Sequence, residues 1–135
     1  GTAAIAALCV YAKLESPQLL HAMLEVSGKL LEETPGQILL QGVPAGFLIA
    51  SVAWIRSAAD DSSFWIVLVL TYAIAAGGFT HVVAGAAEAF LLLWSGEAGI
   101  GWVFGGFLIP AFIGNVLGGT GLFALLAHAQ VKGEL

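Results

Sequence analysis

The feature that most limits how this chain can fold is a series of apolar segments long enough to cross a lipid bilayer. The hydrocarbon core of a bilayer is about 30 Å thick, and an α-helix of about 20 residues spans it. As helices, Gln37 to Ile55 would reach roughly 28 Å and Phe104 to Ala127 roughly 36 Å. Charged residues make up only 10% of the sequence, against about 25% in typical soluble domains. The sequence therefore predicts an all-α polytopic membrane protein.

A third apolar segment, Phe64 to Trp94, is too long for one straight crossing. As a continuous helix it would reach roughly 46 Å, about half as long again as the bilayer core. The pair Gly77-Gly78 lies near its centre, and paired glycines weaken a helix and permit a break. We therefore expect residues 37–135 to form three spans with a broken middle helix. A long tilted helix with one end outside the membrane is the alternative.

The residues before the first span divide into two parts. Residues 1–13 are apolar but too short to span, and we interpret them as the end of a truncated transmembrane helix. Residues 14–36 form a predicted interfacial amphipathic helix and loop, in which Ser16 caps the helix and Pro35-Gly36 ends the element. An extramembrane linker helix is the alternative for this part.

The scarcity of charged and reactive residues excludes several functions. The formal net charge is -5 and no basic run is present, so nucleic acid is not an expected partner. Cys9 is the single cysteine and the histidines lack metal-ligand spacing, so no disulfide or metal site is expected. Because no phosphate loop or nucleophile motif occurs, we expect no catalytic residues, no cofactor and no enzyme activity.

His81 and Glu88 are titratable residues inside the middle segment. Ionisable groups are costly in a membrane, so such residues face protein or a water-filled cavity. Their spacing is close to two helical turns, so a continuous helix would place both on one face. We interpret His81 as facing a permeation path with Glu88 beside it. The alternatives are a structural pair satisfied by neighbouring helices, or a Glu88 that lies near the Trp94 interface.

Small residues in the spans predict where helices pack closely. Asn115 lies between Gly114 and Gly118 in the last span, and we interpret it as a structural amide that hydrogen-bonds a neighbouring helix. Pairs at small-xxx-small spacing are Gly42 and Gly46, Gly101 and Gly105, and Gly114 and Gly118.

Two motifs resemble those of the formate/nitrite transporter family. Residues 78–84, Gly-Phe-Thr-His-Val-Val-Ala, look like the Gly-Phe-x-His-x-x-Ala signature in the fifth helix of that family. Residues 113–119, Ile-Gly-Asn-Val-Leu-Gly-Gly, resemble the Ile-Gly-Asn-x-x-Gly-Gly pattern of the sixth helix. The segment from Gln41 to Trp54 is similar to the fourth helix. The resemblance covers nearly the whole chain and aligns it with the C-terminal half of these proteins.

The resemblance implies an aquaporin-like helical bundle of two inverted three-helix repeats, of which this chain is mainly the second. It implies a homopentamer in the inner (plasma) membrane with a cytoplasmic C-terminus. One pore per protomer would pass small monovalent anions or their weak acids. The missing N-terminal repeat of the same protein is then an expected partner, together with the lipid bilayer.

The resemblance also assigns residues to the pore. His81 matches the central pore histidine, and Phe79 and Thr80 precede it in the matching motif. Glu88 is an added acid that resembles a less characterised branch of the family. The chain departs from the family at Gly46 and Gly85, where asparagine is common.

Three functions are thus considered. The leading hypothesis is a passive or proton-linked pore for a small weak acid or anion. An aquaporin-like channel for neutral solutes is the close alternative, distinguished by whether transport depends on pH and on His81. A non-transporting membrane subunit that anchors partners is the alternative from another class, and it would not need the missing repeat.

Overall fold

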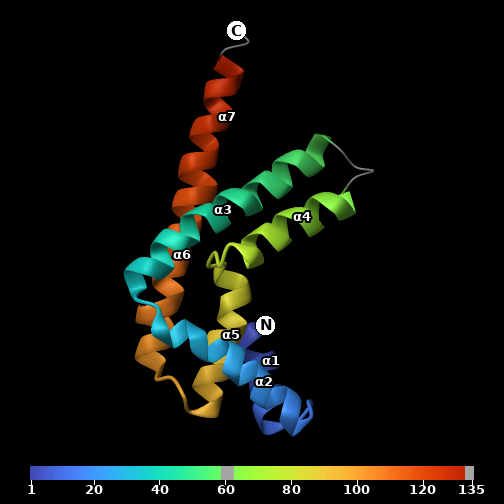
Figure 1. The fold of residues 1–135 in the computed structure, drawn as a ribbon. Coiled ribbons are helices and arrows are strands. Elements are labelled where there is room, and N and C mark those ends of the chain that lie inside the picture. The colour runs from blue at the N-terminus through green and yellow to red at the C-terminus, as the bar shows by residue number, and fades with distance from the viewer. Residues whose placement is uncertain (59–62, 133–135) are drawn as a thin grey trace.

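The computed structural model describes residues 1–58 and 63–132, which form helices joined by short turns (Figure 1). Residues 59–62 and 133–135 of the predicted three-span segment lie outside this description. Two of the helices, Pro35–Ser57 and Trp102–Lys132, are long and apolar enough to cross a membrane. The shorter ones are α1 (Thr2–Tyr11), α2 (Pro17–Gly28) with its 3₁₀ extension η1 (Lys29–Glu32), α4 (Ser63–Ala76) and α5 (Val82–Ser95). The predicted all-helical class and the two long apolar helices are confirmed.

The first long helix, α3 (Pro35–Ala58), begins before the predicted span because its N-terminus is capped. Thr34 N donates a hydrogen bond to Gln37 Oε1 at 2.9 Å, and Gln37 N donates to Thr34 Oγ1 at 3.3 Å. This reciprocal pair is a capping box, and Pro35 suits the first helical position because an N–H there has no helical partner. The prediction that Pro35-Gly36 ends the preceding element was therefore wrong. The pair opens α3, whereas α2 ends at Gly28.

The helix α2 begins as the sequence predicts. Ser16 Oγ accepts a hydrogen bond from Leu19 N at 3.2 Å, and Pro17 is the first helical residue. Between α1 and α2, Lys13 has a positive φ of 51°, a left-handed conformation that reverses the chain direction. The helix α2 therefore returns past α5, while α1 packs along α5.

The last helical stretch continues from Trp102 to Lys132, longer than the predicted Phe104 to Ala127. Its α-helical parts are α6 (Ile109–Val116) and α7 (Phe123–Lys132), and each follows a π-helical part: η3 (Trp102–Leu108) and η4 (Leu117–Leu122).

Contact between the backbones of α3 and α6–η4 holds the two long helices together. A Cβ added at Gly118 would overlap the carbonyl of Val43, and one added at Gly114 would overlap the carbonyl of Leu39. A Cβ at Gly46 would overlap the backbone carbonyl of Asn115. Glycine is therefore required at these positions because the facing atoms belong to backbone that cannot move aside.

The same spacing does not give the same contact elsewhere. Apart from the neighbouring residues and the backbone of the helix itself, no heavy atom of the described chain lies within 4 Å of a Cβ added at Gly101 or Gly105. The prediction of close packing is confirmed for the pairs in α3 and α6–η4, whereas among the described residues no other helix packs against Gly101 and Gly105. A small-xxx-small spacing therefore marks a packing face only where another helix lies opposite.

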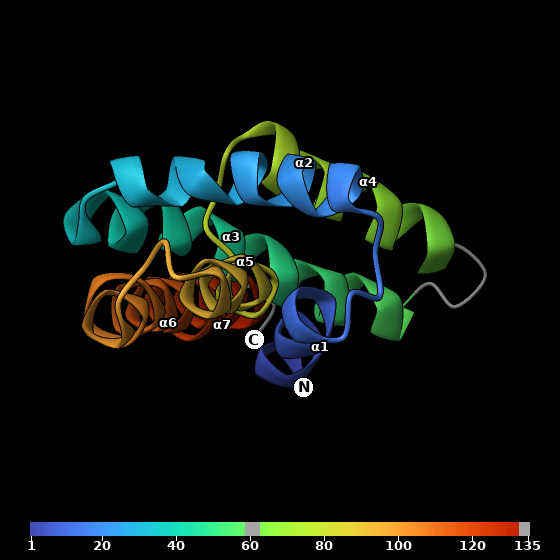
Figure 2. The ribbon, with the colours of Figure 1, turned by 90° about the horizontal axis from the view of Figure 1, so that it is seen from below.

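The two halves of the middle segment pack against different helices. In Figure 1, α4 lies beside α3, whereas α5 turns away toward α1 and α2. Figure 2 shows α5 nearly end-on beside α6 and α1. The core at the junction of α3, α5 and the last helix is fully buried and consists of Ile38, Ala89, Val103, Phe107 and Ala111.

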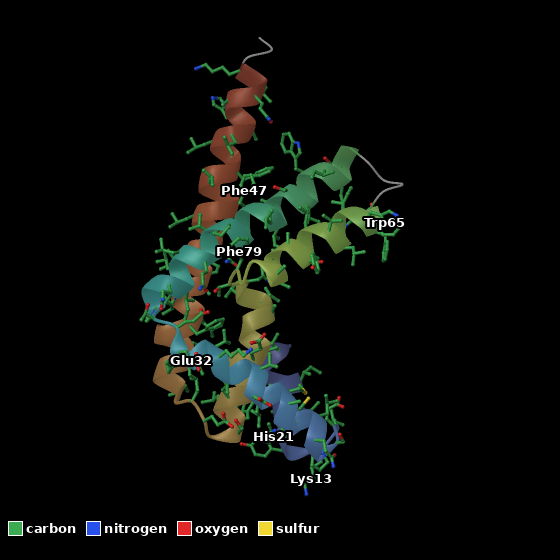
Figure 3. The ribbon with its side chains drawn as sticks, viewed as in Figure 1. Lys13, His21, Glu32, Phe47, Trp65 and Phe79 are labelled. Carbon is green, nitrogen blue, oxygen red and sulfur yellow. The ribbon has the colours of Figure 1, made fainter. Side chains whose placement is uncertain are left out.

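The helix α4 leaves most of its apolar surface uncovered. Ile74 is its buried residue, while Trp65 is 64% exposed and Tyr72 is 72% exposed. Figure 3 shows Trp65 at the end of α4 farthest from α5. Apolar surface of this extent is typical of a segment that faces lipid or another protein chain.

Candidate functional site

The centre of the candidate site is the break between α4 and α5. The helix α4 ends at Ala76 and α5 begins at Val82. Gly78 has a φ of +63°, which side chains rarely allow, and a Cβ on Gly77 would lie 2.6 Å from the ring of Phe79. Gly77 and Gly78 thus allow the chain to leave the helix here (Figure 3).

Asn115 connects this break to both long helices. Its Oδ1 accepts a hydrogen bond from Val82 N at 3.0 Å, at the N-terminus of α5. Its Nδ2 donates to Thr80 O at 2.8 Å and to Gly42 O at 3.0 Å. A backbone group without a partner costs several kcal/mol in a membrane, so one amide from α6 makes the irregular backbone tolerable there.

A second hydrogen-bonded chain runs from the break to the start of α3. Thr80 is 7% exposed, and its Oγ1 donates to Gln41 Oε1 at 2.9 Å. Gln41 Nε2 in turn donates to Glu33 Oε1 at 3.5 Å. Sequence reasoning missed Gln41 and Glu33 as site residues. The sequence feature that could have identified Gln41 is its amide inside an apolar span, because a polar side chain there needs a hydrogen-bond partner.

His81 is the residue just before α5 and caps it. Its Nδ1 accepts a hydrogen bond from Ala84 N at 3.4 Å. Because Nδ1 is the acceptor, the proton of the neutral ring is assigned to Nε2. The ring is partly buried and keeps Nε2–H as a donor.

His81 lines a cavity on each of two sides. The first, of about 310 Å³, lies between α3 and η4 and is also lined by Asn115 and Thr120. We call it the α3–η4 cavity. The second, of about 280 Å³, lies beside the break and α5. The imidazole is therefore shared by two spaces that different helices enclose.

The second cavity brings together the predicted pore residues. Phe79, Thr80, His81 and Glu88 all line it, and Glu33 joins them from the turn before α3. We call it the acidic cavity because of its two glutamates. The cavity thus brings together residues from the turn before α3, from the break between α4 and α5, and from α5 itself.

The reason given for pairing His81 with Glu88 was wrong. That reasoning assumed a continuous helix, whereas His81 has extended backbone angles and only Glu88 lies within α5. The two side chains share a cavity because the break turns the chain beside α5. Glu88 also lines an apolar cavity of about 410 Å³ between α1, α2 and α5, where Cys9 is a neighbour.

Gly46 and Gly85, where the chain departs from the family pattern, are both packed tightly against neighbouring residues. A Cβ on Gly85 would overlap the ring of Phe107, which is fully buried. A Cβ on Gly46 would overlap the backbone of Asn115. In this packing neither position has room for an asparagine side chain.

These features define an all-helical membrane protein whose central segment is broken beside a histidine. The family model for the formate/nitrite transporters matches residues 1–129. The chain therefore belongs to the formate/nitrite transporter family, whose members are transporters and not enzymes.

Two curated relatives are similar to the chain. The inner membrane protein YfdC of Escherichia coli (strain K12) is 28% identical over 135 residues, which are 100% of this chain and 44% of that protein. The uncharacterized transporter YrhG of Bacillus subtilis (strain 168) is 29% identical over 122 residues, which cover 84% of this chain and 44% of that protein. The chain thus spans less than half the length of either relative. No solved structure shows significant similarity to it.

Proposed function

We propose that this chain is the second three-helix repeat of a membrane pore for small monovalent anions or their weak acids, with His81 at its centre. Membership of a transporter family supports a transport role. The observation that carries the proposal is the position of His81, which lines both the α3–η4 cavity and the acidic cavity. A solute that moves between these spaces would pass this imidazole.

The chemistry of the break supports the role given to His81. With Nδ1 engaged at Ala84 N, the ring offers Nε2–H to an oxygen atom of the solute. Imidazole can change its charge near neutral pH, so it can interact with both the anion and the acid. Phe79 and Phe107 add apolar wall to the acidic cavity, which disfavours a hydrated ion.

An N-terminal repeat of the same protein is proposed to form the opposite wall of the pore. The relatives support this, because the aligned part is 44% of each. The uncovered apolar face of α4 offers a surface for such a repeat, for lipid or for another protomer. We propose the inner (plasma) membrane as the location, which agrees with the printed name of one relative.

The function is tested by uptake of a panel of small weak acids into liposomes at two pH values. We expect no uptake through this chain alone, because three spans and a partial helix supply only one wall of the pore. Co-reconstitution with the proposed N-terminal repeat should restore pH-dependent uptake. Robust flux through the chain alone would contradict the two-repeat proposal. Uptake that is independent of both pH and His81 would point instead to a neutral-solute channel.

We also propose that the complete protein assembles as a ring-shaped homo-oligomer, most simply a pentamer as in the family it belongs to. The exposed apolar side chains of α4 and α7 supply surface for contacts between protomers. Native mass spectrometry from mild detergent should detect five copies of the complete protein. A stable monomer with no larger species would rule out this assembly.

A further inference from the structure

We infer that Thr120 is a second solute-binding residue, whose hydroxyl hydrogen-bonds the solute in the α3–η4 cavity. The inference rests on the function proposed above and adds a residue to it. Thr120 lies just outside the two motifs that resemble the family signatures, and sequence reasoning gave it no role.

The first support is the fixed position of Thr120 in η4, a π-helical part of the last helix. π-helical turns inside α-helices are frequent at functional sites. A Cβ added at Gly118 would overlap the carbonyl of Val43, so η4 is held against α3. A Cβ added at Gly119 would lie 3.0 Å from Gly46 O. Because the backbone is held and a β-branched side chain has few rotamers, Thr120 loses little conformational entropy when it binds a ligand.

The second support is that the hydroxyl of Thr120 is available, unlike other hydroxyls in these helices. Thr71 Oγ1 donates to Val67 O at 2.6 Å, and Ser51 Oγ donates to Phe47 O at 2.9 Å. Within a helix, a hydroxyl commonly bonds the carbonyl four residues earlier in this way. Thr120 Oγ1 makes no hydrogen bond to any residue that the structure describes, and its side chain lines the α3–η4 cavity. A hydroxyl inside a membrane protein needs a partner, which water or a solute supplies in this cavity.

The third support is the shortage of other donors in the cavity. Both N–H bonds of Asn115 Nδ2 are engaged, one at Thr80 O and one at Gly42 O. His81 Nδ1 accepts a bond from the backbone, which leaves Nε2–H as the donor of the neutral ring. The remaining residues that line the cavity are small or apolar. In the part of the chain that the structure describes, His81 and Thr120 are therefore the side chains that can donate to a solute here.

The hydroxyl of Thr120 and the imidazole of His81 have complementary chemistry. A hydroxyl can donate to an oxygen of an anion or an acid, and it can accept from the O–H of an acid. Thr120 does not titrate near neutral pH, whereas the charge of His81 changes with pH. Thr120 therefore contributes to solute binding at every pH, while His81 sets the pH dependence.

The test measures formate uptake by liposomes that contain the complete protein with Thr120→Val, over a series of formate concentrations. Valine keeps the shape of threonine but has no hydroxyl. Because one hydrogen bond is removed, the formate concentration that gives half-maximal uptake should rise about threefold to tenfold. The midpoint of the pH profile should stay at the wild-type value, since the variant changes no titratable group.

Further variants separate binding from folding. Thr120→Ser keeps the hydroxyl and should retain the wild-type half-maximal concentration, whereas Thr120→Ala should show the same rise as Thr120→Val. These two variants differ by one oxygen atom, so the comparison holds even if valine disturbs η4. The matched control is Ser51→Ala, because Ser51 Oγ already bonds Phe47 O and its side chain does not line the α3–η4 cavity. This control should leave the half-maximal concentration unchanged.

The results that would overturn the role of Thr120 differ from those that would overturn the pore. Equal half-maximal concentrations for the wild type and Thr120→Ala, or for Thr120→Ser and Thr120→Ala, would show that the hydroxyl does not bind the solute. A loss of stability without a change in this concentration would mean that the hydroxyl bonds another part of the complete protein. Absence of uptake by the wild type under every condition would instead overturn the proposed pore function.

Discussion

Replacing His81 with phenylalanine should reduce solute uptake by about 10- to 100-fold and remove its pH dependence, while the protein remains folded. Phenylalanine keeps a ring of similar volume but has no nitrogen to bond the solute. A hydrogen bond to a charged group contributes about 1.5–3 kcal/mol, which corresponds to this range of rates. Folding should survive because Asn115 still satisfies Val82 N, and the cap from His81 Nδ1 is long at 3.4 Å. Uptake by liposomes across a pH series measures the effect.

The matched control for this variant is His128→Phe. His128 lies exposed in α7, so the same chemical change should leave both the rate and the pH profile unaltered. If His81→Phe behaves like the control, His81 is a packed structural histidine and the proposed pore loses its central residue.

Gly118→Ala should destabilise the helix bundle by about 3 kcal/mol or more, at the upper end of the cost of overpacking a core. The added methyl group would overlap the carbonyl oxygen of Val43 and lie 2.7 Å from its carbonyl carbon and 3.0 Å from Phe47 N. All three atoms belong to the backbone of α3, so relief requires α3 and η4 to separate. Unfolding by a denaturing detergent, followed by circular dichroism, measures the loss.

Gly105→Ala provides the comparison within the same long helix. Outside the neighbouring residues and the backbone of its own helix, a Cβ at Gly105 meets no heavy atom of the described chain within 4 Å. Alanine favours helix over glycine by about 1 kcal/mol, so this variant should be as stable as the wild type or slightly more so. Equal stability of the two alanine variants would mean that α3 and η4 do not approach as closely as described.

Features that depend on local sequence were predictable. The length and hydropathy of residues 37–55 and 104–127 predicted two membrane-length helices, because crossing a bilayer depends on a continuous apolar run. The excess length of residues 64–94 and the pair Gly77-Gly78 predicted an interruption, and the helices do end and restart on either side of that pair. These arguments needed no knowledge of neighbouring helices.

Contacts between distant residues were not predictable in the same way. Gln41 and Thr80 are 39 positions apart, and nothing in the residues between them indicates that they meet. The prediction that His81 and Glu88 share one helix face assumed that both lie in the same helix. The helix α5 begins only at Val82, so His81 lies outside it. Sequence spacing gives directions only along an unbroken element, so the residues at a break must be placed by their tertiary partners.

The hydrogen bonds of Asn115 have a consequence for the order of synthesis. The hydrogen-bond acceptor of Val82 N is the side chain of Asn115, which is synthesised 33 positions later. Until α6 enters the bilayer, the freed backbone at Val82 and Thr80 O lacks this partner, and leaving it bare in lipid is costly. We therefore expect the middle segment to reach its final conformation only after α6 has been made. A helix made later in the chain thus completes the conformation of the segment that carries His81.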